Sequence, residues 1–87
     1  MDKLLEIKGF LSDGLTKKCL YLRIDKPVQI QDTGDYYCRI HCPVFFKTHK
    51  DIFGIDEHQA YDLAVSFIKS ILGGRKMIDR HSKEIKI

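Results

Sequence analysis

The sequence predicts an α+β domain, in which an antiparallel sheet of three to five strands carries one long helix on one face. Three observations lead to this prediction. Apolar residues recur at every second position in several segments, one amphipathic segment with clear start and stop signals follows, and the strand-like segments precede this helix instead of alternating with helices. That order is typical of a two-layer α+β fold.

Two strands joined by a hairpin turn are predicted at the N-terminus. Leu4–Leu11 and Thr16–Ile24 both alternate with the period of a strand. Asp13 and Gly14 lie between them, and Gly14 can adopt the positive φ that a tight turn requires. The connection that follows, Asp25–Asp35, contains a proline and a glycine as strand breakers, and a short extended piece fits between them.

The strongest strand is predicted at Asp35–Phe46. Pro43 cannot donate to a ladder, so the strand either lies at a sheet edge there or bends at a bulge. Its side chains divide into Tyr36, Cys38, Ile40 and Cys42 on one face and Tyr37, Arg39 and His41 on the other. A turn at Lys47–Asp51 then leads to a short strand at Ile52–Ile55.

One helix is predicted between Asp56 and Gly73. Asp56 is a good N-cap because its carboxylate can accept from the free amides of the first turn, and Gln59 completes a capping-box pattern. Gly73 and Gly74 end the helix, since glycine readily adopts the left-handed C-cap conformation. About 16 residues at 1.5 Å each make a rod of roughly 24 Å, which is long enough to cross a four-stranded sheet.

The chain is expected to form a single domain over residues 1–87. Residues 74–87 fit either a terminal strand, with the alternation at Glu84–Ile87, or a flexible basic tail. No apolar run approaches the ~20 residues that a membrane span needs, and the N-terminus lacks the features of a signal peptide. We therefore expect a cytoplasmic protein without a membrane partner. Its three cysteines are expected to be reduced and buried as small apolar residues.

One helix covers one face of the sheet, yet both faces of the predicted strands carry large side chains. The alternation does not show which face the helix takes. An uncovered face of this composition is typical of a contact surface, most often in a homodimer. The alternative is that these tyrosines are ordinary surface residues. The candidate interface residues are Tyr21, Tyr37, Arg39 and His41.

A cluster of Cys38, His41, Cys42 and His49 raises the question of a zinc site. Cys38 and Cys42 stand about 13 Å apart along an extended strand, and His41 points to the opposite face, so we expect no metal. No local signature supports a Cys–His nucleophile pair, and no glycine-rich phosphate loop is present. We therefore expect no catalytic residue, no cofactor and no enzymatic activity.

Residues Tyr36–Leu72 resemble a family of small, uncharacterised bacterial proteins. In that family a Cys-bearing strand precedes a Gly-x-Asp-x-x-Gln-Ala helix start, which is matched here by Gly54, Asp56, Gln59 and Ala60. Such proteins are stand-alone reading frames, some of them in mobile or accessory gene contexts. The resemblance implies an α+β fold and a bacterial cytoplasmic setting, and it implies no activity.

The expected function is that of a non-enzymatic interaction module of accessory or immunity type, which self-associates or binds a protein partner through the open sheet face. The alternative is weak nucleic-acid binding by the basic C-terminal segment. The formal net charge of +3 is too small to support this alternative alone, and solvated surface charge explains the segment equally well. The candidate residues for this alternative are Arg75, Lys76, Arg80, Lys83 and Lys86.

Overall fold

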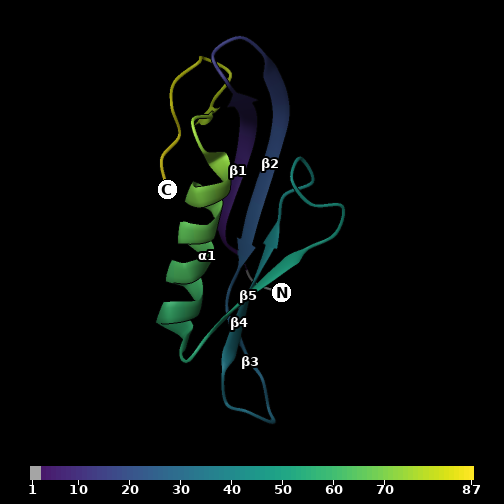
Figure 1. Ribbon diagram of the computed structural model, residues 1–87, viewed down its shortest axis with the longest axis vertical. Helices are drawn as coiled ribbons and strands as arrows, with labels where there is room; N and C mark the ends of the chain where they lie inside the picture. The colour runs from purple at the N-terminus through teal and green to yellow at the C-terminus, as the bar shows by residue number, and fades with distance from the viewer. Residues whose placement is uncertain (1–2) are drawn as a thin grey trace.

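One helix packs on one face of an open antiparallel sheet of six strands, which confirms the predicted fold class (Figure 1). The computed structural model describes residues 3–87. The elements are β1 (Lys3–Ser12), β2 (Lys17–Asp25), β3 (Val28–Gln29), β4 (Tyr36–His41), β5 (Lys50–Gly54), α1 (Glu57–Leu72) and β6 (Lys76–Ile78). The sheet exceeds the predicted three to five strands because two short segments, β3 and β6, also join it.

Two hairpins make up most of the sheet. β1 pairs with β2 along nearly their whole length, and β4 pairs with β5 throughout the latter strand. The hairpins meet at a seam of two residue pairs, Arg23 with His41 and Ile24 with Ile40. Beyond the seam β2 stops before Pro27, which offers no N–H to a ladder, and β3 continues along the same edge of β4.

The turn between β1 and β2 is held by Asp13. Its carboxylate accepts hydrogen bonds from the amides of Leu15 and Thr16, both at 2.8 Å. Gly14 takes a φ of 97°, in the left-handed region that glycine tolerates. The predicted hairpin is therefore confirmed.

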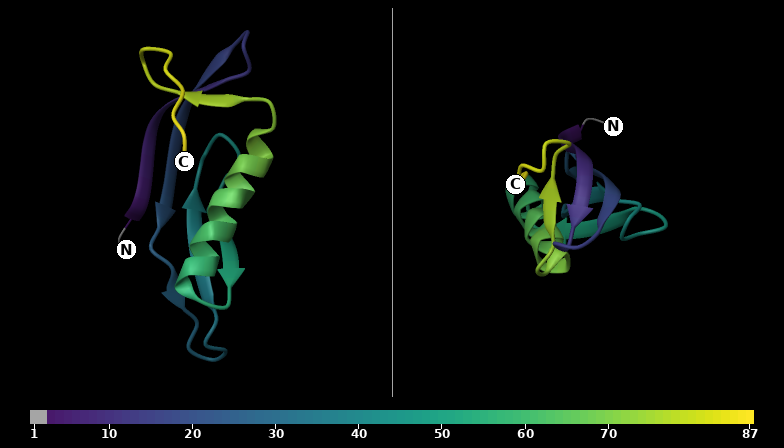
Figure 2. Two further views of the ribbon diagram at one scale, coloured as in Figure 1. Left: turned by 90° about the vertical axis from the view of Figure 1, so that its left-hand side faces the viewer. Right: turned by 90° about the horizontal axis from the view of Figure 1, so that it is seen from above.

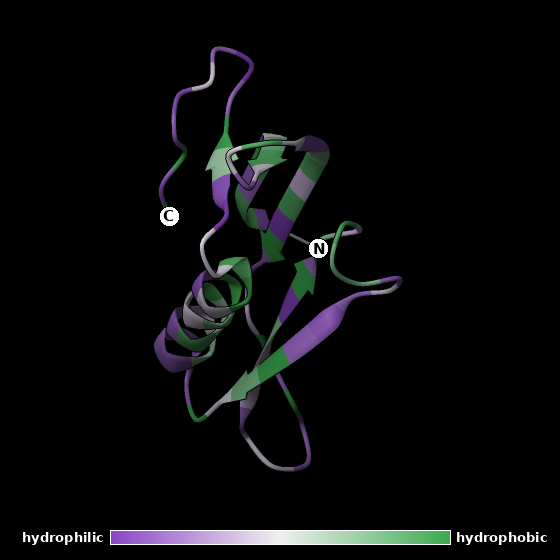
Figure 3. Ribbon diagram, turned by 45° about the horizontal axis from the view of Figure 1, so that its top comes forward, coloured by the Kyte–Doolittle hydropathy of each residue, from purple (hydrophilic) through white to green (hydrophobic). Residues whose placement is uncertain are grey.

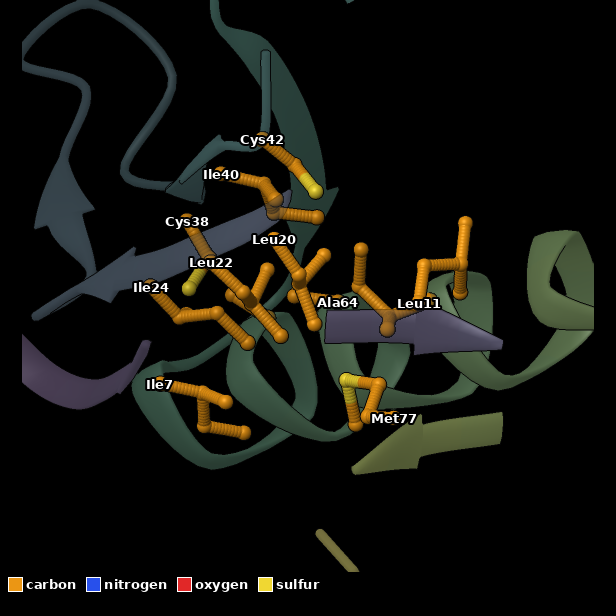
Figure 4. Packing of buried hydrophobic residues seen from close by; sticks show 12 residues of the cluster. Ile7, Leu11, Leu20, Leu22, Ile24, Cys38, Ile40, Cys42, Ala64 and Met77 are labelled. Atoms are coloured by element: carbon orange, nitrogen blue, oxygen red, sulfur yellow. The ribbon is translucent and has the colours of Figure 1, made fainter. Parts of the chain in front are cut away.

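The helix covers the face of the sheet that carries Cys38 and Ile40, and it lies mainly on β4 and β5 (Figure 2). Its Ala60, Ala64 and Ile68 are fully buried or nearly so. The sheet-side residues beneath it form the core, seen together in Figure 4. They are Ile7, Leu11, Leu20, Leu22, Ile24, Cys38 and Ile40 of the strands, with Cys42 just after β4. Figure 3 shows the alternation of hydrophobic and hydrophilic residues along the strands that separates the two faces.

The chain passes from β5 into α1 through a tight β5–α1 joint, Gly54–Ala60. The Asp56 carboxylate accepts from the Gln59 amide at 2.7 Å, which confirms the predicted N-cap. The Gln59 side chain accepts from the amide of Ile55 at 2.8 Å, one residue before the amide that a capping box uses. A Cβ on Gly54 would lie 2.6 Å from the Ala60 nitrogen. The helix start therefore packs directly on the end of β5, at a distance that requires glycine.

The terminal strand is β6 at Lys76–Ile78. The predicted segment Glu84–Ile87 forms no strand and contributes a single bridge, between Glu84 and Ile78. β6 pairs with β1 beside the hairpin turn, a long-range contact that local alternation does not reveal. The chain then turns over Asp79–Lys83 and folds back, and the Ile85 amide donates to the Met77 carbonyl at 2.7 Å. This return segment helps α1 to cover the sheet.

The molecule is elongated, with extents of 46 × 22 × 21 Å. Its radius of gyration is 13.7 Å, against about 12 Å expected for a compact domain of this length. Its accessible surface is 5874 Å², against roughly 5,300 Å² expected for its mass. None of the helical segments in residues 3–87 has both the length and the apolar character that crossing a membrane needs.

The β5–α1 joint generates a prediction about stability. Gly54→Ala should lower the free energy of unfolding by about 1–3 kcal/mol, because the new methyl group would force the helix start away from β5. For a domain of this size, a loss of that order lowers Tm by roughly 5–20 °C.

Thermal unfolding followed by circular dichroism measures this shift. Gly74→Ala is the matched control, since no atom lies within 4 Å of a Cβ placed there. Equal melting temperatures for the two variants would contradict the close-packing argument.

Candidate interaction surface

The open face of the sheet, turned away from α1, brings the four predicted interface residues together. Tyr21 lies on β2, and Tyr37, Arg39 and His41 lie on β4. All four are half-buried. The face is more polar than a bare aromatic surface, because its charged side chains pair with one another.

Three ion pairs lie on this face, and of these the Arg39–Asp51 pair joins two strands. They are Lys3–Glu6 at 2.7 Å, Arg23–Asp25 at 2.6 Å and Arg39–Asp51 at 2.8 Å. Arg39 also donates from Nη2 to the second oxygen of Asp51 at 3.1 Å, so this pair is bidentate. The hydrogen bond from Arg39 lowers the pKa of Asp51, and the one from Lys3 lowers the pKa of Glu6. The three pairs together carry no net charge.

Asp25 is a buried carboxylate at the seam between the two hairpins, and its residue surface is 2% exposed. One oxygen accepts from Arg23, and the other lies 2.9 Å from Nε2 of His41. Its backbone carbonyl accepts from the Cys38 thiol at 3.2 Å. Burial raises the pKa of Asp25, but hydrogen bonds with His41 and Arg23 outweigh burial, and the pKa lies below the usual value. Asp25 therefore ties β2 to β4 through side chain and backbone.

An aromatic patch lies at the β4–β5 end of the open face. Tyr37 and Phe53 are cross-strand partners whose ring centroids are 6.4 Å apart. The guanidinium of Arg39 lies 5.4 Å from the centre of the Tyr37 ring, within the range of a cation–π contact. Phe53 is 59% exposed. We name these three residues the Tyr37–Phe53 patch.

The other two predicted interface residues are engaged within the protein. The Tyr21 hydroxyl donates to Glu6 at 2.8 Å. His41 contacts Asp25, and its ring centroid lies 6.3 Å from that of His49. These side chains order the open face, whereas the Tyr37–Phe53 patch is the part that offers apolar area.

The cysteines occupy two different environments. Cys38 and Cys42 are buried on the helix side, as expected, whereas His41 lies on the open face. Burial raises the pKa of Cys38 to about 11, so this thiol is protonated at neutral pH. Cys19 is exposed, contrary to the expectation of a buried residue, because its position on β2 faces away from the helix.

The structure separates the five residues of the nucleic-acid alternative. Arg75 caps the helix by donating to the Ile71 and Leu72 carbonyls at 2.7 and 3.1 Å. Lys76 lies 3.9 Å from Glu84. Arg80 lies in the turn after β6, next to the open face of β1. Lys83 and Lys86 are exposed.

Sequence reasoning missed Asp25 and Phe53. The pattern assigns Asp25 to a connection, because Pro27 follows so closely, and no local signal shows that β2 carries it to the seam. Phe53 belongs to the predicted strand Ile52–Ile55. Neighbouring residues of a strand point to opposite faces, so its position next to Ile52 is the available signal that Phe53 lies on the open face.

Comparisons of the chain with protein-family models, with curated proteins and with solved structures found no match. The resemblance of Tyr36–Leu72 to small bacterial proteins stays a prediction. The structure gives its motif a physical meaning, since Gly54, Asp56, Gln59 and Ala60 are the residues that build the β5–α1 joint.

The buried carboxylate predicts a pH-dependent stability. Because the folded-state pKa of Asp25 is lowered, its charge stabilises the fold above the ordinary carboxyl pKa of about 4, and this contribution disappears as pH falls through the lower folded value. Asp25→Asn should cost about 1–3 kcal/mol at pH 7, because it weakens a buried hydrogen-bonded pair.

Thermal unfolding of both proteins between pH 2 and pH 7 tests this expectation. The difference in Tm should be largest above about pH 5 and should shrink below about pH 4. Asp32→Asn, in the exposed β3–β4 loop, is the control and should melt like the wild type. A difference for Asp25→Asn that stays constant over the whole range would contradict the assigned role.

Proposed function

We propose that the protein is a non-enzymatic interaction module that forms a homodimer through its open sheet face, with the Tyr37–Phe53 patch at the centre of the contact. The observation that carries this proposal is the Tyr–Arg–Phe cluster on the open face, in which Phe53 is exposed and Tyr37 and Arg39 are half-buried. The ion pairs around it add no net charge. Tyr and Arg are enriched among the residues that dominate binding energy in interfaces.

A second copy of the chain is the occupant that the charge pattern favours. Each of the three ion pairs presents one cation and one anion, so these pairs contribute both signs in equal number. A two-fold axis places the same mixed surface on both sides, where each sign can meet its opposite. A strongly charged partner gains little from these paired charges.

The shape of the chain supports association as well. The surface of 5874 Å² exceeds the expectation for a compact domain of this mass by several hundred Å². A standard interface buries about 800 Å² per partner. A contact of that size on the open face would return the exposed area per chain to an ordinary value or below it.

A hydrolytic or redox enzyme activity has less support from the site than a contact function. Asp25 and His41 resemble part of a catalytic arrangement, in which a nucleophile lies within hydrogen-bond reach of the imidazole. The thiols of Cys38 and Cys42 lie in the core on the other side of β4, and burial raises the pKa of both. The Asp25–His41 contact is better explained as a tie across the seam.

Size-exclusion chromatography with multi-angle light scattering, under reducing conditions, tests the dimer. The wild type should have twice the chain mass of 10.1 kDa at micromolar concentration. Phe53→Ser should raise the dimer Kd roughly thirtyfold, since a central interface residue contributes about 2 kcal/mol. Tyr37→Ser should act in the same direction.

Leu15→Ser is the matched control, because Leu15 is 95% exposed at the tip of the β1–β2 turn, away from the patch. It should leave the dimer intact. Circular dichroism checks that all variants are folded. A wild-type monomer at 200 µM, or a dimer that Phe53→Ser leaves unchanged, would overturn the proposal.

A further inference from the structure

A second surface feature lies at the other end of the sheet, near the β1–β2 turn. A shallow groove of about 570 Å³ is formed there by the open face of β1 and β2 and by the turn after β6. Its volume lies within the range of about 300–1,000 Å³ that is usual for ligand sites. It is lined by Lys8, Gly9, Phe10, Cys19, Asp79, Arg80 and His81.

The groove is rimmed by basic side chains. Within residues 3–87, neither Lys8 nor Arg80 forms an ion pair with a carboxylate, in contrast to the two arginines of the open-face ion pairs. Lys17 reaches the same turn, with its Nζ 3.2 Å from the Ser82 hydroxyl. On the rim, Nε of Arg80 donates to Nε2 of His81 at 3.4 Å.

The acid in the groove is already satisfied. One oxygen of Asp79 accepts from the amides of His81 and Lys83 at 2.8 and 3.0 Å, and the hydrogen bonds from these two amides lower the pKa of Asp79. Its carboxylate therefore holds the turn in shape. Two lysines and one arginine against this one carboxylate leave the groove with an excess of positive charge.

Phe10 gives the groove an apolar floor. It pairs with Cys19 across the hairpin and is half-buried, with β6 beside it. An aromatic ring on an open sheet, with cations at its rim, provides a stacking surface for a base and contacts for the neighbouring phosphates. Neither part of this arrangement depends on the Tyr37–Phe53 patch.

We propose that this groove binds single-stranded nucleic acid, with a base stacked on Phe10 and the phosphate backbone on Lys8, Lys17 and Arg80. The groove is shallow and lies on the surface, so an extended strand does not have to be threaded into an enclosed cavity. A strand that continues past the groove also reaches the exposed Lys83 of the same turn. A free nucleotide would use the stacking surface but would lose these flanking phosphate contacts.

Fluorescence anisotropy with a labelled 12-nucleotide oligo-dT measures the binding. About three phosphate contacts predict a slope near −2 for log K against log[salt], so affinity should fall roughly twentyfold between 50 and 200 mM salt. Thymidine monophosphate at the same concentration should compete at least tenfold more weakly than unlabelled oligo-dT. Equal competition by the mononucleotide would overturn the assignment to a continuous strand.

Matched variants locate the site. Lys8→Ala with Arg80→Ala should weaken binding at least tenfold and should make the salt dependence shallower. Lys26→Ala with Lys47→Ala removes the same charge from exposed positions outside the groove and should have no more than a twofold effect. Phe10→Leu keeps an apolar floor but removes stacking, and should weaken binding about tenfold.

Cys19 reports on the site independently of affinity. It is the exposed cysteine of the three and lines the groove, whereas Cys38 and Cys42 are buried. Bound oligo-dT should slow the reaction of Cys19 with Ellman's reagent at least fivefold, and the Lys8→Ala, Arg80→Ala protein should lose this protection.

The proposal is overturned by absent binding at 100 µM protein in 50 mM salt, by equal loss of affinity in the two double variants, or by unprotected Cys19 in the complex. The oligomeric state is measured separately, on the Phe53→Ser protein, so failure of the groove and failure of the dimer give different results.

Discussion

The fold depends on the close contact between the end of β5 and the start of α1. Gly54 lets the backbone of Ala60 approach to a distance that excludes any side chain. The Asp56 cap then sets the first turn of the helix at that point. Position and direction of α1 follow from this joint, because a rigid helix that is fixed at one end can cover only one face of the sheet. The opposite face is left to solvent or to a partner.

The two faces solve different physical problems. On the helix side, Leu22, Ile24 and Ile40 are fully buried, and the hydrophobic effect holds the layers together. On the open side there is no covering layer, and side-chain contacts join the strands: Arg39–Asp51 joins β4 to β5, and Asp25–His41 joins β2 to β4. The polar face therefore stabilises the sheet itself, and its aromatic patch is the part available to a second molecule.

The sequence predicts the features that short-range chemistry determines. Asp56 and Gly73 delimit the helix through their own backbone preferences, and Asp13 with Gly14 closes the first hairpin in the same way. β6 escapes prediction because its pairing with β1 joins segments more than 60 residues apart. The charge cluster after the helix is visible in sequence, but Arg75 proves to be a helix cap. The groove joins Phe10 to a turn 70 residues later, and no local pattern connects them.

The short seam has a mechanical consequence. In the part of the chain that the structure describes, two backbone residue pairs connect the β1–β2 hairpin to the β4–β5 hairpin. Within each hairpin the two strands are paired along most of their length. A sheet bends most easily where the fewest hydrogen bonds resist the bend. The seam is therefore expected to bend more easily than either hairpin. The side chains of Asp25 and His41 contact each other at the seam and add one connection between the hairpins. The groove lies beside the β1–β2 hairpin and the aromatic patch on the β4–β5 hairpin, so a bend at the seam would change the angle between them.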